Sequence, residues 1–181
     1  MEVKMSKRTG VVVLLEGSEQ CGKTTLADKI HNEFKADYLH GDHPDYNSFV
    51  NFHYDMCQTA IDMAGAGHVI ILDRCFISHE VYSTLFDGQP EYDTHQLCNE
   101  LLASLADYGA KSLLVYCRPN RIFDPDMREE MYDDSDGKIQ VKFDEVIEQY
   151  AQPFNNFIRY DYTVDPSGNS VLNLIEELHR G

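Results

Sequence analysis

The sequence has few of the basic residues that nucleic-acid and membrane proteins use for binding. Only 15 of its 181 residues are lysine or arginine, against 31 aspartates and glutamates, so the formal net charge is −16. Duplex DNA and anionic membranes are bound largely through basic faces, and a surface this acidic repels both. We therefore expect no nucleic acid and no membrane as the main partner. A small anion in a locally positive pocket remains compatible with this charge.

Long apolar runs and closely paired cysteines are also missing. The apolar run near the start, residues 11–15, is too short for a signal sequence or a membrane span. The cysteines are odd in number and none stands in a Cys-x-x-Cys pair, so we expect reduced thiols in or near the core and a cytoplasmic location. They are Cys21, Cys57, Cys75, Cys98 and Cys117.

Internal repeats, low-complexity tracts and long linkers are absent from the sequence as well. At roughly 150 residues per domain, a chain of 181 residues corresponds to one domain, which we place at 1–181. The apolar content of 43% is enough to form one hydrophobic core that needs no disulfide or metal ion to stabilise it.

Short apolar runs alternate with segments of helical periodicity. Strands are predicted at 11–15, 37–40, 69–72, 113–116 and 160–164, and helices at 24–34, 48–64, 94–108, 143–158 and 171–179. This alternation predicts a three-layer α/β fold with a parallel five-stranded sheet flanked by helices. Residues 118–137 interrupt it with prolines, arginines and an acidic run. We expect them to form a short lid over the carboxyl ends of the strands, with a solvated loop as the alternative.

A glycine-rich phosphate-binding loop is the strongest signal in the chain. Residues 17–24 match the pattern Gly-x4-Gly-Lys-Ser/Thr and lie between a predicted strand and a predicted helix. The glycines let main-chain N–H groups converge on phosphate oxygens, and the helix adds its positive N-terminal end. The pattern assigns Lys23 to the β- and γ-phosphates of ATP and Thr24 to Mg²⁺. The residues expected to bind the nucleotide are Gly17, Ser18, Glu19, Gln20, Cys21, Gly22, Lys23, Thr24 and Thr25.

One residue of this loop also carries a reactivity hypothesis. Cys21 lies among the loop amides and close to Lys23, and a nearby ammonium lowers the pKa of a thiol. Bound ATP should then protect Cys21 from alkylation.

A second motif lies at the carboxyl end of the third predicted strand. Asp73 and Arg74 follow the apolar run 69–72. A carboxylate at this edge can hold Mg²⁺ directly or through water, and an arginine can hold an acceptor phosphate or the transferring group. A surface ion pair is the plain alternative.

These two motifs resemble the thymidylate kinase and deoxynucleoside kinase group of P-loop enzymes. Residues 15–25 are similar to its Glu-Gly opening with an acidic residue inside the loop. Residues 72–78, followed by Val81 and Tyr82, are similar to its Asp-Arg-aromatic-x-x-Ser segment with a tyrosine a few residues on. The resemblance implies that Glu19 binds the 3′-hydroxyl of the acceptor sugar, that Asp73 and Arg74 keep the roles above, and that Tyr82 contacts the acceptor.

The resemblance also implies an arginine from the lid. Members without an arginine in the loop supply one from the lid, and the corresponding loop position is Gln20. Arg121 and Arg128 are then the catalytic candidates, with Arg118 as a third. A guanidinium fork can bridge donor and acceptor oxygens while negative charge develops on them. Relatives often pair through helices beside the sheet, so a homodimer is compatible with the resemblance.

The acceptor side departs from the family pattern. Thymidylate kinases usually have Arg-Glu-Pro after the second strand, where this chain has residues 42–44 as Asp-His-Pro. Phe49, Phe52 and Tyr54 could stack on a base, but no lysine or arginine occurs between positions 35 and 74. A monophosphate acceptor is bound best by cationic side chains such as arginine and lysine. A neutral hydroxyl acceptor instead needs a base, for which Asp42 is the candidate and Asp45 the second choice. Asp42 can equally be a turn residue.

The leading hypothesis is therefore phosphoryl transfer from Mg·ATP to a nucleoside monophosphate, with dTMP or another deoxynucleotide as the expected small-molecule substrate. The alternative is a deoxynucleoside kinase that uses Asp42 as base. A GTP-driven switch lacks its Asn-Lys-x-Asp motif, and residues 165–168 rather form a turn near the adenine. A polynucleotide 5′-kinase is opposed by the net charge. The histidines at 40, 43 and 53 match no zinc spacing.

Overall fold

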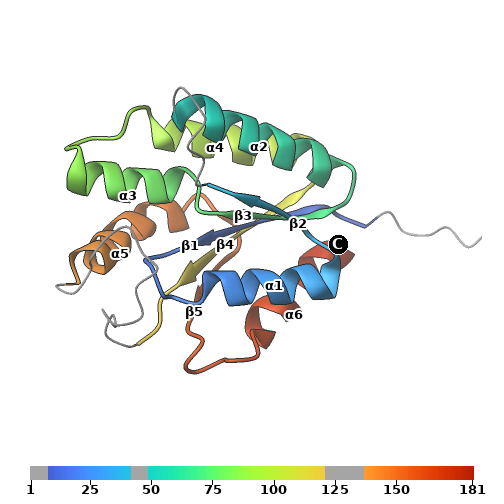
Figure 1. The fold of residues 1–181 in the computed structure, drawn as a ribbon. Coiled ribbons are helices and arrows are strands. Elements are labelled where there is room, and N and C mark those ends of the chain that lie inside the picture. The colour runs from blue at the N-terminus through green and yellow to red at the C-terminus, as the bar shows by residue number, and fades with distance from the viewer. Residues whose placement is uncertain (1–7, 42–48, 121–136) are drawn as a thin grey trace, which may run out of the picture.

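The centre of the protein is a parallel sheet of five strands (Figure 1). The computed structural model describes residues 8–41, 49–120 and 137–181. The strands are β1 (Val11–Glu16), β2 (Asp37–His40), β3 (Val69–Asp73), β4 (Lys111–Cys117) and β5 (Phe157–Tyr160). Their order in the sheet is β2-β3-β1-β4-β5, with all neighbours parallel. The predicted three-layer α/β fold is confirmed.

The apolar run of β1 occupies the middle of this sheet. All six of its residues are buried, because the strand has a neighbour on each side and a helical layer on each face. Val12 and Leu14 enter the apolar cluster on one face. Val13 and Leu15 enter the cluster on the other face. Side chains that alternate between two buried faces explain why a central parallel strand is apolar throughout.

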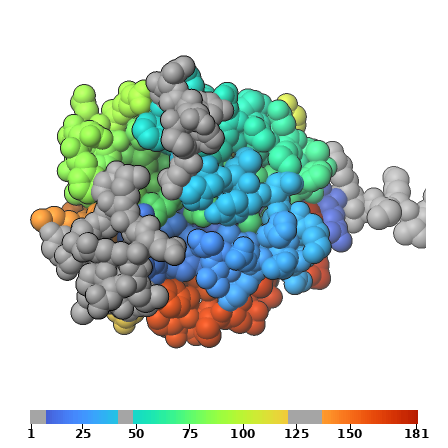
Figure 2. Space-filling model, viewed as in Figure 1, coloured from blue at the N-terminus to red at the C-terminus, as the bar shows by residue number. Residues whose placement is uncertain are grey.

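Helices cover both faces of the sheet. They are α1 (Lys23–Phe34), α2 (Phe49–Gly65), α3 (Phe76–Phe86), α4 (Thr94–Asp107), α5 (Lys138–Ala151) and α6 (Asn169–Arg180). α1 and α6 lie on one face, and α2, α3 and α4 on the other (Figure 1). The surfaces of α1 and α6 adjoin in the space-filling view (Figure 2). Among the described residues, no helix is both long and apolar enough to cross a bilayer.

The structure corrects the sequence prediction in two places. The predicted helix 143–158 begins earlier, at Lys138, and ends at Ala151, shortly before Pro153, which has no N–H to continue a helix. The last strand is therefore 157–160 rather than 160–164. α3 was not predicted, because it is buried over much of its surface and its apolar residues mark no single stripe.

The strand order determines where a ligand can bind. The chain places β3 on one side of β1 and β4 on the other, so the connections leaving the carboxyl ends diverge and a crevice forms there. Residues that follow β1, β2, β3 and β5 all meet at this edge. Segments far apart in sequence are thereby brought into one site.

Gly10, immediately before β1, tests how tightly this sheet packs against α2. A Cβ at Gly10 would lie 1.9 Å from the main-chain oxygen of Ala64. We expect Gly10→Ala to lower the free energy of unfolding by about 2–3 kcal/mol, because backbone atoms have to move. Urea unfolding followed by circular dichroism measures this loss.

Gly65→Ala is the matched control. Its Cβ would meet the ring of Tyr108 at 3.0 Å, and this ring is exposed and can turn away. The expected change is within about 1 kcal/mol. Equal losses in the two variants would contradict the packing argument.

Candidate active site

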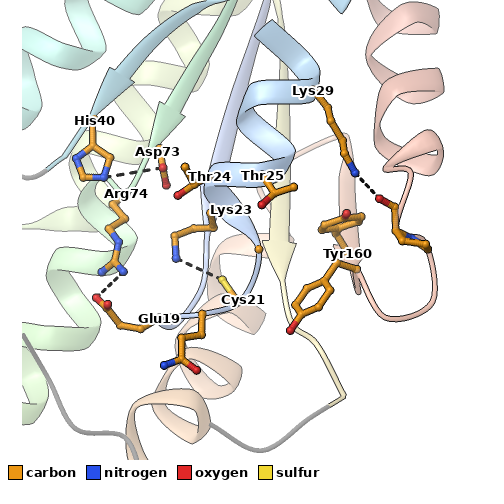
Figure 3. A pocket seen from close by; sticks show the side chains of 14 residues that line it. Glu19, Cys21, Lys23, Thr24, Thr25, Lys29, His40, Asp73, Arg74 and Tyr160 are labelled. Atoms are coloured by element: carbon orange, nitrogen blue, oxygen red, sulfur yellow. Dashed lines mark hydrogen bonds and ion pairs between the residues drawn. The ribbon is translucent and has the colours of Figure 1, made fainter. Parts of the chain in front are cut away.

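A cavity of about 590 Å³ lies at the carboxyl edge of the sheet (Figure 3). Nine of the residues lining it were predicted from the sequence: Glu19, Gln20, Cys21, Gly22, Lys23, Thr24, Thr25, Asp73 and Arg74. Of the other five, Pro166 belongs to the turn that the sequence placed near the adenine, and four were not assigned to the site: Lys29, His40, Tyr160 and Tyr162. The fold thus brings both predicted motifs into one cavity.

The loop between β1 and α1 depends on its two glycines. Gly17 has φ +146° and Gly22 has φ +86°, both in the region that disfavours a side chain. A Cβ on Gly17 would lie 2.4 Å from the main-chain oxygen of Cys117, and one on Gly22 would lie 2.8 Å from the ring of Tyr162. The loop therefore packs directly against β4 and against the segment after β5.

Lys23 turns its ammonium back into this loop. Its Nζ donates to the main-chain oxygens of Gly17 (2.9 Å) and Ser18 (2.7 Å) and to Sγ of Cys21 (3.3 Å). The residue is buried, with 6% of its surface exposed. The positive charge is thereby fixed at the cavity wall, at the beginning of α1, where the helix dipole adds positive potential.

The Cys21 thiol is activated by its neighbours. Burial alone raises its pKa, but a hydrogen bond from Cys117 and the charge of Lys23 outweigh burial and lower the pKa to about 6. The partner thiol shows the opposite effect, since the hydrogen bond to Cys21 and burial raise the pKa of Cys117 well above its usual range. All five cysteines are free and buried, as predicted.

Asp73 ends β3 with one carboxylate oxygen satisfied and one without a partner. Oδ2 accepts a 2.5 Å hydrogen bond from Tyr38 and lies 3.9 Å from Nε2 of His40. Oδ1 is buried and has no hydrogen-bond partner among the described residues. A buried carboxylate oxygen in this condition favours a ligand that supplies positive charge or a proton donor. Thr24, exposed in the same cavity, offers a hydroxyl beside it.

Arg74 follows in a left-handed turn. Its φ is +59°, and its main-chain N–H donates to Leu15 across the sheet (3.1 Å). The guanidinium donates to Glu19 Oε1 at 2.6 Å and to the hydroxyl of Tyr82 at 3.2 Å. Figure 3 shows the pair of Arg74 and Glu19 on the side of the cavity opposite Tyr160.

Glu16 stabilises the turn at Arg74 through hydrogen bonds to the residues that follow it. Its carboxylate is fully buried and accepts from the main-chain N–H of Cys75 (3.0 Å) and from the Ser78 hydroxyl (2.5 Å). Burial raises its pKa to about 7, although the two hydrogen bonds and the charges of Lys23 and Arg74 act in the opposite direction. Glu16 ties the end of β1 to the first turn of α3 and so fixes the residue that follows Arg74.

The other end of the cavity is aromatic. Tyr160 ends β5, and Tyr162 and Pro166 follow it. The Lys29 ammonium donates to the main-chain oxygen of Pro166 and joins α1 to this segment. The sequence placed the turn 165–168 near a base. It gave no reason to select the tyrosines, which follow a strand whose bounds were misplaced.

Other predicted residues lie around the cavity or outside the described chain. Tyr82 reaches the site through Arg74. Phe52 is buried in the core, whereas Phe49 is half exposed and packs against His79, and neither lines this cavity. The Arg118 side chain is bound to Asp144 at 2.9 Å and does not line this cavity. Asp42, Asp45, Arg121 and Arg128 lie outside the described residues.

Metal-binding side chains show no separate cluster. Within residues 8–41, 49–120 and 137–181, no group of three or more histidine, cysteine, aspartate or glutamate side chains could hold an ion. His53 is buried, and its Nδ1 lies 2.5 Å from the Tyr92 hydroxyl. Burial, together with the charge of His79, lowers its pKa to about 3.

Comparisons with known proteins place the fold. No protein-family model matches the sequence, and no curated protein matches it. The structure of YorR from Bacillus subtilis, in complex with phosphorylated GDP, is similar at a TM-score of 0.66 and 19% identity, covering 94% of this chain and 98% of YorR. Thymidylate kinase from Candida albicans has a TM-score of 0.51 at 18% identity, covering 94% and 92%. Deoxyadenosine kinase from M. mycoides with bound dCTP has 0.52 at 13%, covering 92% and 99%.

These likenesses establish that the chain has the fold of P-loop kinases. The predicted resemblance to the thymidylate and deoxynucleoside kinase group is confirmed at the level of the fold. At such low identity, the choice of acceptor has to be argued from the site itself.

Glu16 predicts a dependence of stability on pH. Its pKa is about 7 in the folded chain and 4.5 ordinarily, so folding takes up a proton between these values and stability falls as the pH rises from about 5 to 7. The loss is on the order of 3 kcal/mol. Glu16→Gln keeps an acceptor for the Cys75 N–H, offers its amide N–H to the Ser78 hydroxyl, which then accepts instead of donating, and has no charge to bury. We expect its urea midpoint to change less than that of the wild type between pH 5 and pH 8. The same pH slope in both proteins would contradict the assignment.

Proposed function

We propose that this chain is an ATP-dependent phosphotransferase that phosphorylates a nucleoside monophosphate, with dTMP or another deoxynucleoside monophosphate as acceptor. One observation carries the proposal. The cavity is lined by the buried ammonium of the glycine loop and by the pair that Glu19 of the same loop forms with Arg74, which follows β3. The first suits a triphosphate donor, and the second suits an acceptor that has both an anionic and a hydroxyl group.

The loop provides the donor end. Phosphate oxygens can accept from successive main-chain N–H groups of residues 17–24 and from Lys23. Lys23 now donates to two carbonyl oxygens and a sulfur, and a triphosphate would offer it formally charged oxygens instead. The aromatic end, with Tyr160 and Tyr162, is placed to receive the base.

The residues present suit a magnesium ion. The Thr24 hydroxyl and the unpartnered Oδ1 of Asp73 are the oxygen donors that this ion prefers. When bound, Mg²⁺ neutralises charge on the β- and γ-phosphates of the donor. Tyr38 keeps the other carboxylate oxygen occupied, so Asp73 presents one oxygen in a fixed direction.

At the acceptor end, the bound substrate replaces an ion pair of the protein. Without substrate, Arg74 and Glu19 form this ion pair at 2.6 Å, and their side chains are each 14% exposed. A nucleoside monophosphate brings a phosphate for Arg74 and a sugar hydroxyl for Glu19, so both groups keep a partner when the pair separates. Tyr82 holds the guanidinium meanwhile. Arg121 and Arg128 are proposed to bridge the transferring group from the lid.

A nucleoside kinase is the second candidate. It is favoured by the same ion pair, since Arg74 is already neutralised and no lysine or arginine occurs between positions 35 and 74. In that case the acceptor is a neutral 5′-hydroxyl, and Asp42 accepts its proton.

A panel of acceptors tests the two candidates. ATP turnover is measured with nucleosides and with their monophosphates, using the wild type, Arg74→Ala, Arg74→Lys and Asp42→Asn. We expect turnover with a monophosphate, a loss of about 10²-fold in kcat/KM for Arg74→Ala, and only partial recovery with Arg74→Lys, which keeps the charge and loses the fork. Turnover only with nucleosides, lost in Asp42→Asn, would favour the second candidate.

Lys23→Ala tests the donor site that both candidates share. We expect Mg·ATP affinity to fall on the order of 10²-fold, because the buried cation that faces the phosphates is removed. Lys111→Ala, an exposed lysine at the opposite edge of the sheet, should bind like the wild type. Calorimetry that finds normal binding in Lys23→Ala would overturn the proposed function.

A further inference from the structure

Two thiols meet beneath the phosphate-binding loop. Glu16 of β1 pairs with Tyr116 of β4, so the residues that follow, Gly17 and Cys117, lie side by side. A Cβ on Gly17 would be 3.0 Å from Sγ of Cys21. The missing side chain of Gly17 therefore leaves space for the Cys21 sulfur next to the end of β4. Cys21 and Cys117 belong to the same buried cluster.

The two sulfurs differ in character. The Lys23 ammonium donates to Cys21 at 3.3 Å, whereas Cys117, next to Cys21 across Gly17, receives no such bond from a described cation. The ammonium stabilises Cys21 as a thiolate, and the interaction with Cys21 and burial raise the pKa of Cys117, which keeps its proton. A thiolate that reacts first, with a neutral thiol at hand to resolve the product, is the arrangement needed for reversible oxidation.

Small oxidants can reach this sulfur through the cavity. Cys21 is 1% exposed, yet it is part of the wall of the 590 Å³ cavity. Cys117 lies behind it and does not line the cavity. The reactive residue therefore borders the cavity and the resolving residue does not.

We propose that Cys21 and Cys117 are a redox modification site, whose disulfide switches off nucleotide binding. A hydroperoxide such as H₂O₂ is the oxidant. The Cys21 thiolate attacks one peroxide oxygen, an S–O bond forms and the O–O bond breaks, and with one proton the products are a sulfenic acid and water. The sulfur of Cys117 then displaces the hydroxyl, which leaves as water with the Cys117 proton. Overall, two thiols and one H₂O₂ give one disulfide and two waters.

Disulfide formation and nucleotide binding exclude each other for a structural reason. The disulfide draws Cys21 toward β4 and fixes the loop, whose amides have to converge on phosphate. Conversely, a bound triphosphate takes the Lys23 ammonium and withdraws the charge that stabilises the thiolate. Reciprocity then requires that each event disfavour the other. This step rests on the phosphate-binding part of the proposed function, whereas the thiol pairing does not.

A second pair of thiols in the same chain is an internal comparison. The sulfurs of Cys57 and Cys75 lie 3.9 Å apart in the cluster on the other face. Neither lines the cavity, and no described lysine or arginine donates to their sulfurs. If closeness of two sulfurs were sufficient, Cys57 and Cys75 would form a disulfide. If a lysine next to the thiol is also required, only Cys21 and Cys117 should react.

The experiment oxidises the purified full chain with H₂O₂. We expect a mass loss of 2 Da, a Cys21–Cys117 cross-link in peptide mapping, Mg·ATP affinity reduced at least about tenfold, and full recovery with dithiothreitol. Mg·ATP added first should slow the cross-link severalfold. Cys117→Ser should bind Mg·ATP normally before oxidation and give no cross-link, and Cys57→Ser should behave as the wild type.

Three results would overturn the inference: a cross-link between Cys57 and Cys75 instead, no cross-link at all, or a Cys21–Cys117 cross-link that leaves Mg·ATP affinity unchanged. If Cys117→Ser fails to fold, nucleotide protection of the wild type still decides. If the reduced protein binds no Mg·ATP, the proposed function is wrong. Peptide mapping of the cross-link needs no nucleotide, so it still tests whether Cys21 and Cys117 form a disulfide.

Discussion

A buried ammonium without a carboxylate partner, in the part of the chain that the structure describes, is the constraint on which the site depends. Lys23 is met by two carbonyl oxygens and one sulfur, which carry partial charge or depend on ionisation of Cys21. A buried cation held by such weak partners raises the affinity of the cavity for an anion. The glycines of the loop serve this arrangement, since they let the chain fold around the ammonium. After the interaction with Cys117, the charge of this ammonium is the next contribution that lowers the pKa of Cys21.

Three carboxylates near this cation, those of Glu16, Glu19 and Asp73, make different interactions because their environments differ. Glu16 is buried beneath the loop and is taken up by hydrogen bonds to the start of α3. Glu19 is near the surface of the cavity and pairs with Arg74. Asp73 is buried at the end of β3, with one oxygen held by Tyr38 and the other without a partner among the described residues. In a chain of net charge −16, the cavity is thus lined by Lys23, Lys29 and Arg74 as well as by carboxylates.

The sequence was sufficient to predict the glycine loop and most of its residues that line the cavity, because this part of the site is local. Strand, glycine loop and helix follow each other within residues 11–34, and the spacing of Gly17, Gly22 and Lys23 carries its own geometry. The contacts of Glu19 with Arg74 and of Tyr38 with Asp73 join positions 55 and 35 residues apart. They depend on the order of strands in the sheet, which periodicity does not reveal. The same is true of Cys21 and Cys117.

The strand order has a further consequence for how firmly each half is held. The loop leaves β1, which has a neighbour on both sides, whereas Tyr38 and His40 come from β2, a four-residue strand at the margin of the sheet. Fewer hydrogen bonds have to break to release a marginal strand than a central one. The side of the cavity at Tyr38 and His40 can thus open and re-form while the loop after β1 keeps its shape, so one wall of the cavity is stiff and the wall that holds Oδ2 of Asp73 is yielding.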